Sequence, residues 1–121
     1  MTLESDKFNR QAVEMIGAAS TQGEQLLVHS YMLVESAALL QRRLGSEASL
    51  LFLSTAASFE TVWVDGELHT EALRFLSRKG TSAVSLVDAV SFLIMRSHGI
   101  TNYIGFDKHF LAAGFTQYLS E

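Results

Sequence analysis

The stretch SLVDAVSFLIMRSHGITNYIGFD, residues 85–107, decides the fold of this chain. Its first part, 85–98, is mostly apolar with helical spacing and is followed by Gly99, a residue that favours a helix end. Residues 102–106 fit a short buried strand, and Asp107 comes directly after it. A helix that leads into a buried strand predicts an α/β protein, in which Asp107 either caps the next turn or holds a charged group.

The same alternation of strand and helix signals runs through the rest of the 121 residues. Strands are predicted at 25–29, 60–64 and 102–106, with an edge strand at 115–119. Helices are predicted at 5–19, 30–44, 46–57, 67–79 and 85–98, with a short helix or turn at 108–113. Strands separated by helices predict a mainly parallel sheet with helices on both faces, and ligand sites at the carboxyl ends of the strands. With no repeat or linker, we expect a single domain over 1–121.

The composition indicates a chain that folds around one core in a reducing compartment. Hydrophobic residues make up 48% of the sequence, yet no run approaches the ~20 apolar residues of a membrane span. The first ten residues are polar and include acidic residues, unlike a signal peptide, and cysteine is absent, which excludes disulfides and thiolate metal sites. The net charge of −4 argues against a protein that coats nucleic acid by bulk charge. We expect a cytoplasmic protein with no membrane partner.

Two carboxylates on predicted helices have both a functional and a structural interpretation. Glu35 has mostly apolar neighbours three and four positions away, where a carboxylate is costly unless it is paired or binds a metal. The alternative is a solvated helix face on which it meets Arg42 or Arg43. Asp88 follows Ser85 by three residues, so it belongs either to a helix cap or to a site at the helix start.

Together with Asp107, these acids predict a metal site. If Glu35, Asp88 and Asp107 converge, their oxygens suit Mg²⁺ or Mn²⁺, and without a cation they repel one another. Such a cluster at the strand ends favours metal-assisted hydrolysis of a phosphodiester. The histidines show no zinc-ligand spacing, and we expect them at the surface or at helix ends; they are His29, His69, His98 and His109.

Residues 85–115 closely resemble the C-terminal half of PIN-domain ribonucleases, which include the VapC-type toxins of bacterial toxin–antitoxin pairs. The matching motifs are SLVDA at 85–89, MR at 95–96 and FDKHF at 106–110. Upstream, VESAALLQRRLG at 34–45 and WVDGELHTEALRFLSR at 63–78 resemble family segments, so the likeness covers nearly the whole chain. It implies a PIN-like three-layer α/β/α sandwich with a mainly parallel central sheet.

The resemblance also implies a function and its residues. Members of the family use acidic side chains around Mg²⁺ or Mn²⁺ to cut RNA, commonly as homodimers, and a VapC-like toxin has an antitoxin partner. Carried over by position, Glu35, Asp88 and Asp107 are the expected catalytic metal ligands. The expected substrate-binding residues are Ser85 at the helix start, with Arg96 and Lys108 near the phosphate; for the two basic residues, surface solvation is the alternative.

The chain departs from the family at its front. The family opens with a central strand that ends in an aspartate, and this sequence has no such strand; Glu4 and Asp6 do not substitute, because neither follows an apolar strand. Gly105 also stands where the family often has Thr or Ser. Whether the chain is an enzyme is therefore left open. The alternatives are a catalytically degenerate PIN-like module for protein interaction or dimerisation, or a plain α/β interaction domain in which all three acids are caps.

The missing strand has a structural consequence. It would lie between the strands at 25–29 and 102–106, and each buried backbone group left unpaired costs about 1–3 kcal/mol, against a total stability of ~5–15 kcal/mol. We expect one of three repairs: the flanking strands close on each other, a partner or second copy supplies a strand, or the natural protein is longer at its start.

Overall fold

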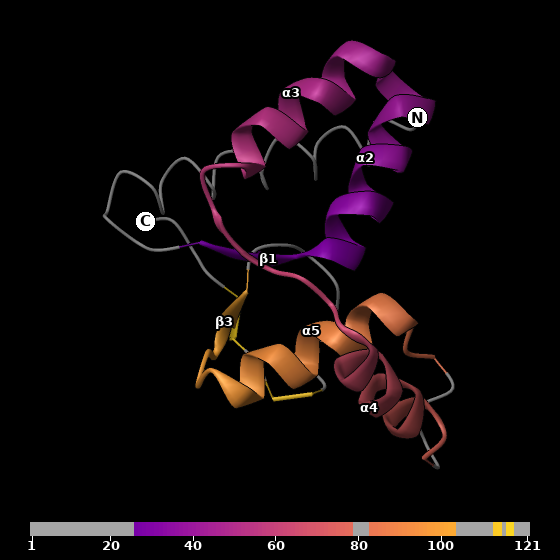
Figure 1. Cartoon of the computed structure of the whole chain (residues 1–121), viewed down its shortest axis with the longest axis vertical. Helices are drawn as coiled ribbons and strands as arrows, with labels where there is room; N and C mark the ends of the chain where they lie inside the picture. The colour runs from indigo at the N-terminus through magenta and orange to yellow at the C-terminus, as the bar shows by residue number, and fades with distance from the viewer. Residues whose placement is uncertain (1–25, 79–82, 104–112, 115, 118–121) are drawn as a thin grey trace.

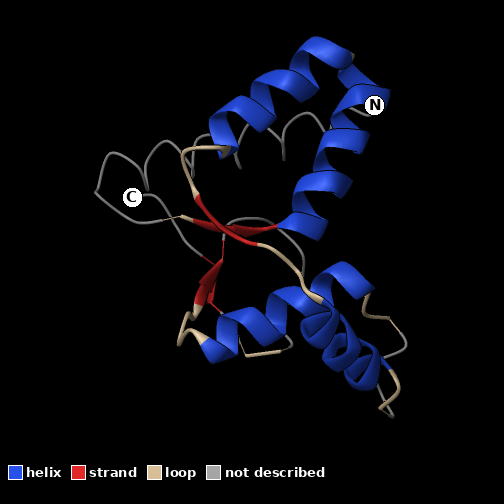
Figure 2. Ribbon diagram, in the orientation of Figure 1, coloured by secondary structure: helices blue, strands red, loops and turns tan. Residues whose placement is uncertain are grey.

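The computed structural model describes residues 26–78, 83–103, 113, 114, 116 and 117. The elements are β1 (Leu27–His29), α2 (Ser30–Leu44), α3 (Ser46–Ala56), β2 (Glu60–Val62), α4 (Gly66–Leu76), α5 (Leu86–Ser97), β3 (Asn102–Tyr103) and β4 (Thr116–Gln117). This alternation confirms the predicted α/β class, as Figures 1 and 2 show. The predicted helix at 5–19, the turn at 108–113 and the absent first strand concern residues outside the described part.

All strand pairs that the structure describes are parallel, as predicted. β1 pairs with β2, with Leu27 opposite Glu60 and His29 opposite Val62, and β3 pairs with β4. In the described strands these are two separate two-stranded sheets, so β1 and β3 are not closed on each other there. The predicted strand at 60–64 was too long. β2 ends earlier because the backbone N–H of Val64 donates to the Ser30 hydroxyl at 2.9 Å rather than to a neighbouring strand.

Local hydrogen bonds decide where the helices begin. Three helices start at a side chain that accepts from the backbone N–H three residues on: His29 Nδ1 from Met32 at 3.3 Å, Asp65 Oδ1 from Leu68 at 2.8 Å, and Ser85 Oγ from Asp88 at 3.1 Å. The Ser85 cap is the one predicted from sequence spacing. At the other ends, Gly45 and Gly99 adopt φ of 97° and 67°, values that glycine accepts without strain.

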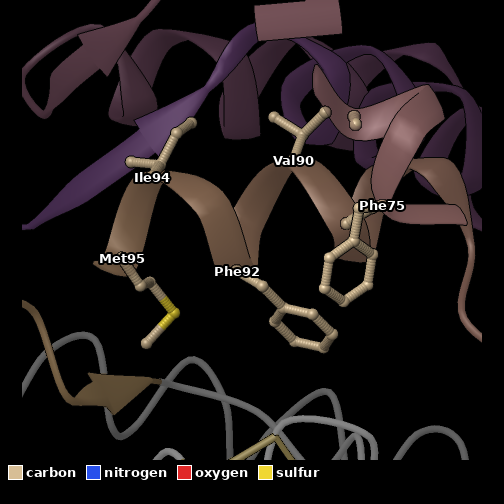
Figure 3. Close-up of a cluster of buried hydrophobic side chains, with 7 residues drawn as sticks. Phe75, Val90, Phe92, Ile94 and Met95 are labelled. Carbon is tan, nitrogen blue, oxygen red and sulfur yellow. The ribbon is translucent and has the colours of Figure 1, made fainter. Parts of the chain in front are cut away.

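The hydrophobic core lies between α4 and α5 and extends to the strands. Its buried side chains are Ala72 and Phe75 from α4, with Ala89, Val90, Phe92, Ile94 and Met95 from α5. Figure 3 shows Val90 and Ile94 pointing toward β1, while Phe92 and Met95 point to the opposite side. Phe92 also packs edge-on against Phe75, with 6.1 Å between ring centroids. α5 is therefore buried on two sides and is the central helix of the described part.

In contrast, α2 and α3 form a hairpin that is poorly buried. No residue of α2 is fully buried, and a single residue, Gly45, joins the two helices. The Ser49 hydroxyl donates to the Ala37 carbonyl at 2.9 Å and ties them together. Large apolar side chains on this hairpin are exposed: Val34, Leu39, Leu44, Leu50, Leu51 and Leu53. Within the described ranges, no helix has the length and hydropathy needed to cross a membrane.

Candidate active site

Three consecutive residues where β1 passes into α2 each hydrogen-bond to a different element. We call His29, Ser30 and Tyr31 the α2 anchor. His29 Nε2 lies 2.8 Å from Ser91 Oγ of α5, Ser30 Oγ accepts from the Val64 N–H after β2 at 2.9 Å, and the Tyr31 hydroxyl lies 2.6 Å from His69 Nδ1 of α4. The anchor thus joins β1, α2, α4 and α5 at the carboxyl end of β1, the position that the α/β rule assigns to ligand sites.

His29 is the buried member of the anchor, with only 4% of its surface exposed. Its Nδ1 accepts from the Met32 N–H, so Nε2 carries the proton and donates to Ser91 Oγ, whose hydroxyl donates onward to the Val87 carbonyl at 3.1 Å. All of these hydrogen bonds form together only when the His29 ring is neutral. Burial lowers the pKa of His29 from 6.5 to about 4.

The prediction that the histidines lie at the surface or at helix ends is met by His29, which caps α2 although its side chain is buried. His69 is half-buried in α4. His69 packs edge-on against the Tyr31 ring, with 5.8 Å between centroids. The sequence did contain a signal for a site here. The polar run HSY at 29–31 follows the apolar run QLLV directly, and ligand sites in α/β proteins lie at the carboxyl ends of strands.

Glu35 lies in the second turn of α2, and its side chain is exposed. Of the two interpretations given above, this exposure fits the solvated helix face, because water can solvate the carboxylate. Glu35 follows Tyr31 by four residues, so the two lie one turn apart on the same helix face. This leaves a hydrated carboxylate one turn away from the α2 anchor.

Asp88 lies in the first turn of α5 and is partly exposed. It precedes Ser91 by three residues, so Asp88 and the anchor's partner share one face of α5. The His29–Ser91 hydrogen bond thereby brings the start of α2 and the first turns of α5 together, with β1 between them in Figure 1. Glu35 and Asp88 thus lie on two helices that are linked through the His29–Ser91 hydrogen bond at the carboxyl end of β1.

The remaining predicted site residues are placed as follows. Asp107 and Lys108 lie outside the described residues. Arg96 is exposed at the last turn of α5, and its guanidinium donates to the Ala113 carbonyl at 3.4 Å. The Ser85 hydroxyl accepts from the Asp88 N–H, as a helix cap does. The roles of all four in substrate or metal binding stay predictions.

The described residues fit a hard divalent cation in part. No group of three or more His, Asp or Glu side chains within them is placed to hold a metal ion. Glu35 and Asp88 nevertheless carry carboxylate oxygens, the ligand type that Mg²⁺ takes, and Mg²⁺ often binds through one or two carboxylates and several waters. A third ligand from Asp107, outside the described part, would complete the set expected from the sequence.

This parallel α/β fold, with a buried hydrogen bond from the end of β1 to α5, belongs to a known class of proteins. The PIN domain family matches residues 2–115, and the chain belongs to that family. The chain is 38% identical to the 23S rRNA-specific endonuclease VapC20 of Mycobacterium tuberculosis, in both the CDC 1551 / Oshkosh and the H37Rv strains. That likeness spans 96 residues, 76% of this chain and 72% of the relative.

A solved structure shows the same likeness. The crystal structure of Mycobacterium tuberculosis VapC20, described as a sarcin–ricin loop cleaving toxin, superimposes with a TM-score of 0.71 at 34% identity. It covers 76% of this chain and 72% of that chain. The expectations of a PIN-like α/β fold and a VapC-like PIN endoribonuclease are thereby confirmed.

Proposed function

We propose that this endoribonuclease depends on Mg²⁺ or Mn²⁺ held by Glu35, Asp88 and Asp107. The observation that supports the proposal is the buried His29–Ser91 hydrogen bond, because it joins the residue that caps the helix of Glu35 to the helix of Asp88. When bound, the ion would supply Lewis-acid activation of the scissile phosphate and of water. Hydrolysis adds one water across a P–O bond and leaves one phosphate end and one hydroxyl end.

The chain's own groups have complementary tasks in this proposal. Glu35 and Asp88 present anionic oxygens that attract the cation and keep it at the start of α5. Ser85 holds the first turn of α5 closed through its bond to the Asp88 N–H. Arg96 and Lys108 are the basic groups proposed to contact phosphates of the RNA; for Arg96, the exposure of its side chain supports this role.

The substrate we propose is a structured loop of ribosomal RNA. The VapC20 proteins are named 23S rRNA-specific endonucleases, and the solved one is described as cleaving the sarcin–ricin loop. Sequence-specific recognition of RNA favours loops, because their unstacked bases are accessible. Such a substrate and the lack of cysteine in the sequence support a cytoplasmic site of action.

Cleavage of a transcript that contains this loop, with Mn²⁺ added, tests the proposal. We expect Asp88→Asn to lower the cleavage rate at least about 100-fold, since even outer-shell partners of a metal contribute 10–100-fold. Asp65→Asn is the matched control: it removes the same charge at a helix start, and asparagine caps as well as aspartate does. Cleavage that persists in EDTA, or full activity in Asp88→Asn, would contradict the proposed metal site.

We also propose that the α2–α3 hairpin is an interaction surface through which two copies of the chain form a homodimer. Leu51 and Val34 expose 69% and 71% of their surface, and contiguous exposed apolar side chains mark interaction sites. The same surface would serve the alternative function, a degenerate PIN module that acts by binding.

Sedimentation of the purified chain tests the homodimer. We expect Leu51→Ser to shift the chain from dimer to monomer, because the substitution removes apolar area from the contact. Leu73→Ser, an equivalent change at an exposed leucine of α4, should leave the dimer intact. A monomeric parent chain would contradict the homodimer, while a dimer without nuclease activity would favour the binding module.

A further inference from the structure

We propose that the α2 anchor and Ser91 are positioning residues that set the placement of Glu35 relative to Asp88. The inference rests on the proposed function, in which these two carboxylates hold a divalent cation. The observation behind it is that three adjacent residues bind three elements that are distant in sequence, by 62, 34 and 38 residues.

The anchor leaves the first turn of α2 little freedom to shift. Both ring nitrogens of His29 are engaged, so a tilt of the ring breaks the bond either to Met32 or to Ser91. The ring and the Ser91 side chain are both buried, and a buried polar atom without a partner is costly. Ser30 and Tyr31 add restraints in other directions, toward the segment after β2 and toward α4.

The anchor is also close enough to both carboxylates to control them. Glu35 lies four residues beyond Tyr31, a rise of about 6 Å along α2. Asp88 lies three residues before Ser91, a rise of about 4.5 Å along α5. Glu35 is thus about one helical turn from Tyr31 of the anchor, and Asp88 is about one turn from Ser91, the anchor's partner; a helix transmits a displacement over that distance almost unchanged. A loosened anchor would separate or misalign the two ligands without removing either.

A purely structural role for these residues makes a different prediction. If the anchor only stabilises the fold, its loss lowers the melting temperature and leaves metal affinity unchanged at temperatures where the chain is folded. If the anchor positions the carboxylates, metal affinity falls in protein that is fully folded, because outer-shell partners orient metal ligands. The affinity for Mn²⁺, measured well below the melting temperature, therefore separates the two roles.

Calorimetric titration of the full chain with Mn²⁺ is the test. We expect Ser91→Ala to weaken Mn²⁺ binding about tenfold. The matched control is Ser97→Ala on the same helix, whose hydroxyl donates to the Ile94 carbonyl at 3.1 Å and makes no contact with the anchor; its affinity should equal that of the parent. Ser91→Thr keeps the hydroxyl and should restore the affinity.

A double-mutant cycle makes the assignment specific to the His29–Ser91 bond. His29→Asn keeps a side-chain acceptor for the Met32 N–H but is too short to reach Ser91. It should weaken Mn²⁺ binding as much as Ser91→Ala does, and the double variant should bind no more weakly than either one. If His29→Asn fails to fold, the comparison of Ser91→Ala, Ser91→Thr and Ser97→Ala still decides the question.

The outcomes distinguish this inference from the proposed function. Unchanged Mn²⁺ affinity in folded Ser91→Ala overturns the positioning role, and the metal site stands. If the parent chain binds no Mn²⁺, the proposed function fails instead, and positioning is judged from the backbone amide resonances of Glu35 and Asp88. If the anchor sets the positions of Glu35 and Asp88, their resonances shift in Ser91→Ala and not in Ser97→Ala. If the two variants give the same resonances, the positioning role is rejected.

Discussion

His29 shows how one buried side chain links protonation to folding. Its ring sits between β1 and α5 and is satisfied only as the neutral Nε2–H form, because the Met32 N–H occupies the other nitrogen. Adding a proton would place two N–H groups against each other inside the protein. Burial away from water lowers the pKa of His29 to about 4. Between about pH 4 and 6.5, His29 therefore binds a proton in the unfolded chain but not in the folded chain.

We therefore predict that stability falls with acidification below pH 6.5. The folded pKa of His29 is below the unfolded value of 6.5, so the unfolded state binds more protons and the free energy of unfolding rises with pH between about 4 and 6.5. The full contribution is up to about 3 kcal/mol. Urea unfolding from pH 4 to 7 measures it, with His29→Asn as the reference that lacks this slope and shares the carboxylates. Parallel curves for the two chains would contradict the prediction.

The residue scale also shows what local pattern can and cannot predict. The Ser85 cap over Asp88 was predictable, since it depends on two residues three apart. The His29–Ser91 bond was not, because it joins positions 62 residues apart and only the packing of α5 beneath β1 brings them together. The spacing left two interpretations of Glu35 open for the same reason: apolar neighbours along one helix do not show whether that face meets another element.

Among the elements, α5 carries the most packing. It supplies five of the seven fully buried apolar residues of the described core and contacts α4 on one side and β1 on another. Its helical period was legible in the sequence, and the predicted ends at 85 and 98 are the observed cap positions. Strand lengths were less predictable, because the end of β2 depends on Ser30, which is 34 residues from Val64.

Truncation of a core side chain in α5 tests whether this helix is the centre of the core. Phe92 is 1% exposed and packs on Phe75, so we expect Phe92→Ala to lower the free energy of unfolding by about 3–5 kcal/mol. Leu73→Ala in α4 is the control, because Leu73 is 47% exposed and loses little burial. Chemical denaturation of both variants measures the difference; similar losses in the two would mean that α5 is not the centre of the core.

For the whole molecule, the metal site should act as a source of stability. In the proposed site, the carboxylates of Glu35 and Asp88 would repel each other, and a bound cation would remove that repulsion only in the folded chain. The fold class and the family were predictable from the sequence because the motifs around Asp88 and Asp107 are local runs. The convergence of the acids stays a hypothesis, because it depends on how the helices pack and on Asp107, which lies outside the described residues.

We predict that Mn²⁺ stabilises the folded chain. At 100 times the dissociation constant, binding to the folded state alone adds about 2.7 kcal/mol to the free energy of unfolding. Thermal unfolding with and without Mn²⁺ measures the gain, and EDTA should reverse it. Asp88→Asn should lose the gain and Asp65→Asn should retain it. Equal stabilisation of both variants would indicate nonspecific binding of the ion.

The connection between α2 and α3 at Gly45 restricts how the two helices move. Gly45, with φ of 97°, is the single residue between them, so the connection is short, and the hydrogen bond from the Ser49 hydroxyl to the Ala37 carbonyl holds the two helices together. A displacement of α3 is therefore transmitted to α2 and to the carboxylate of Glu35. A partner that binds α3 and shifts it would also shift that carboxylate.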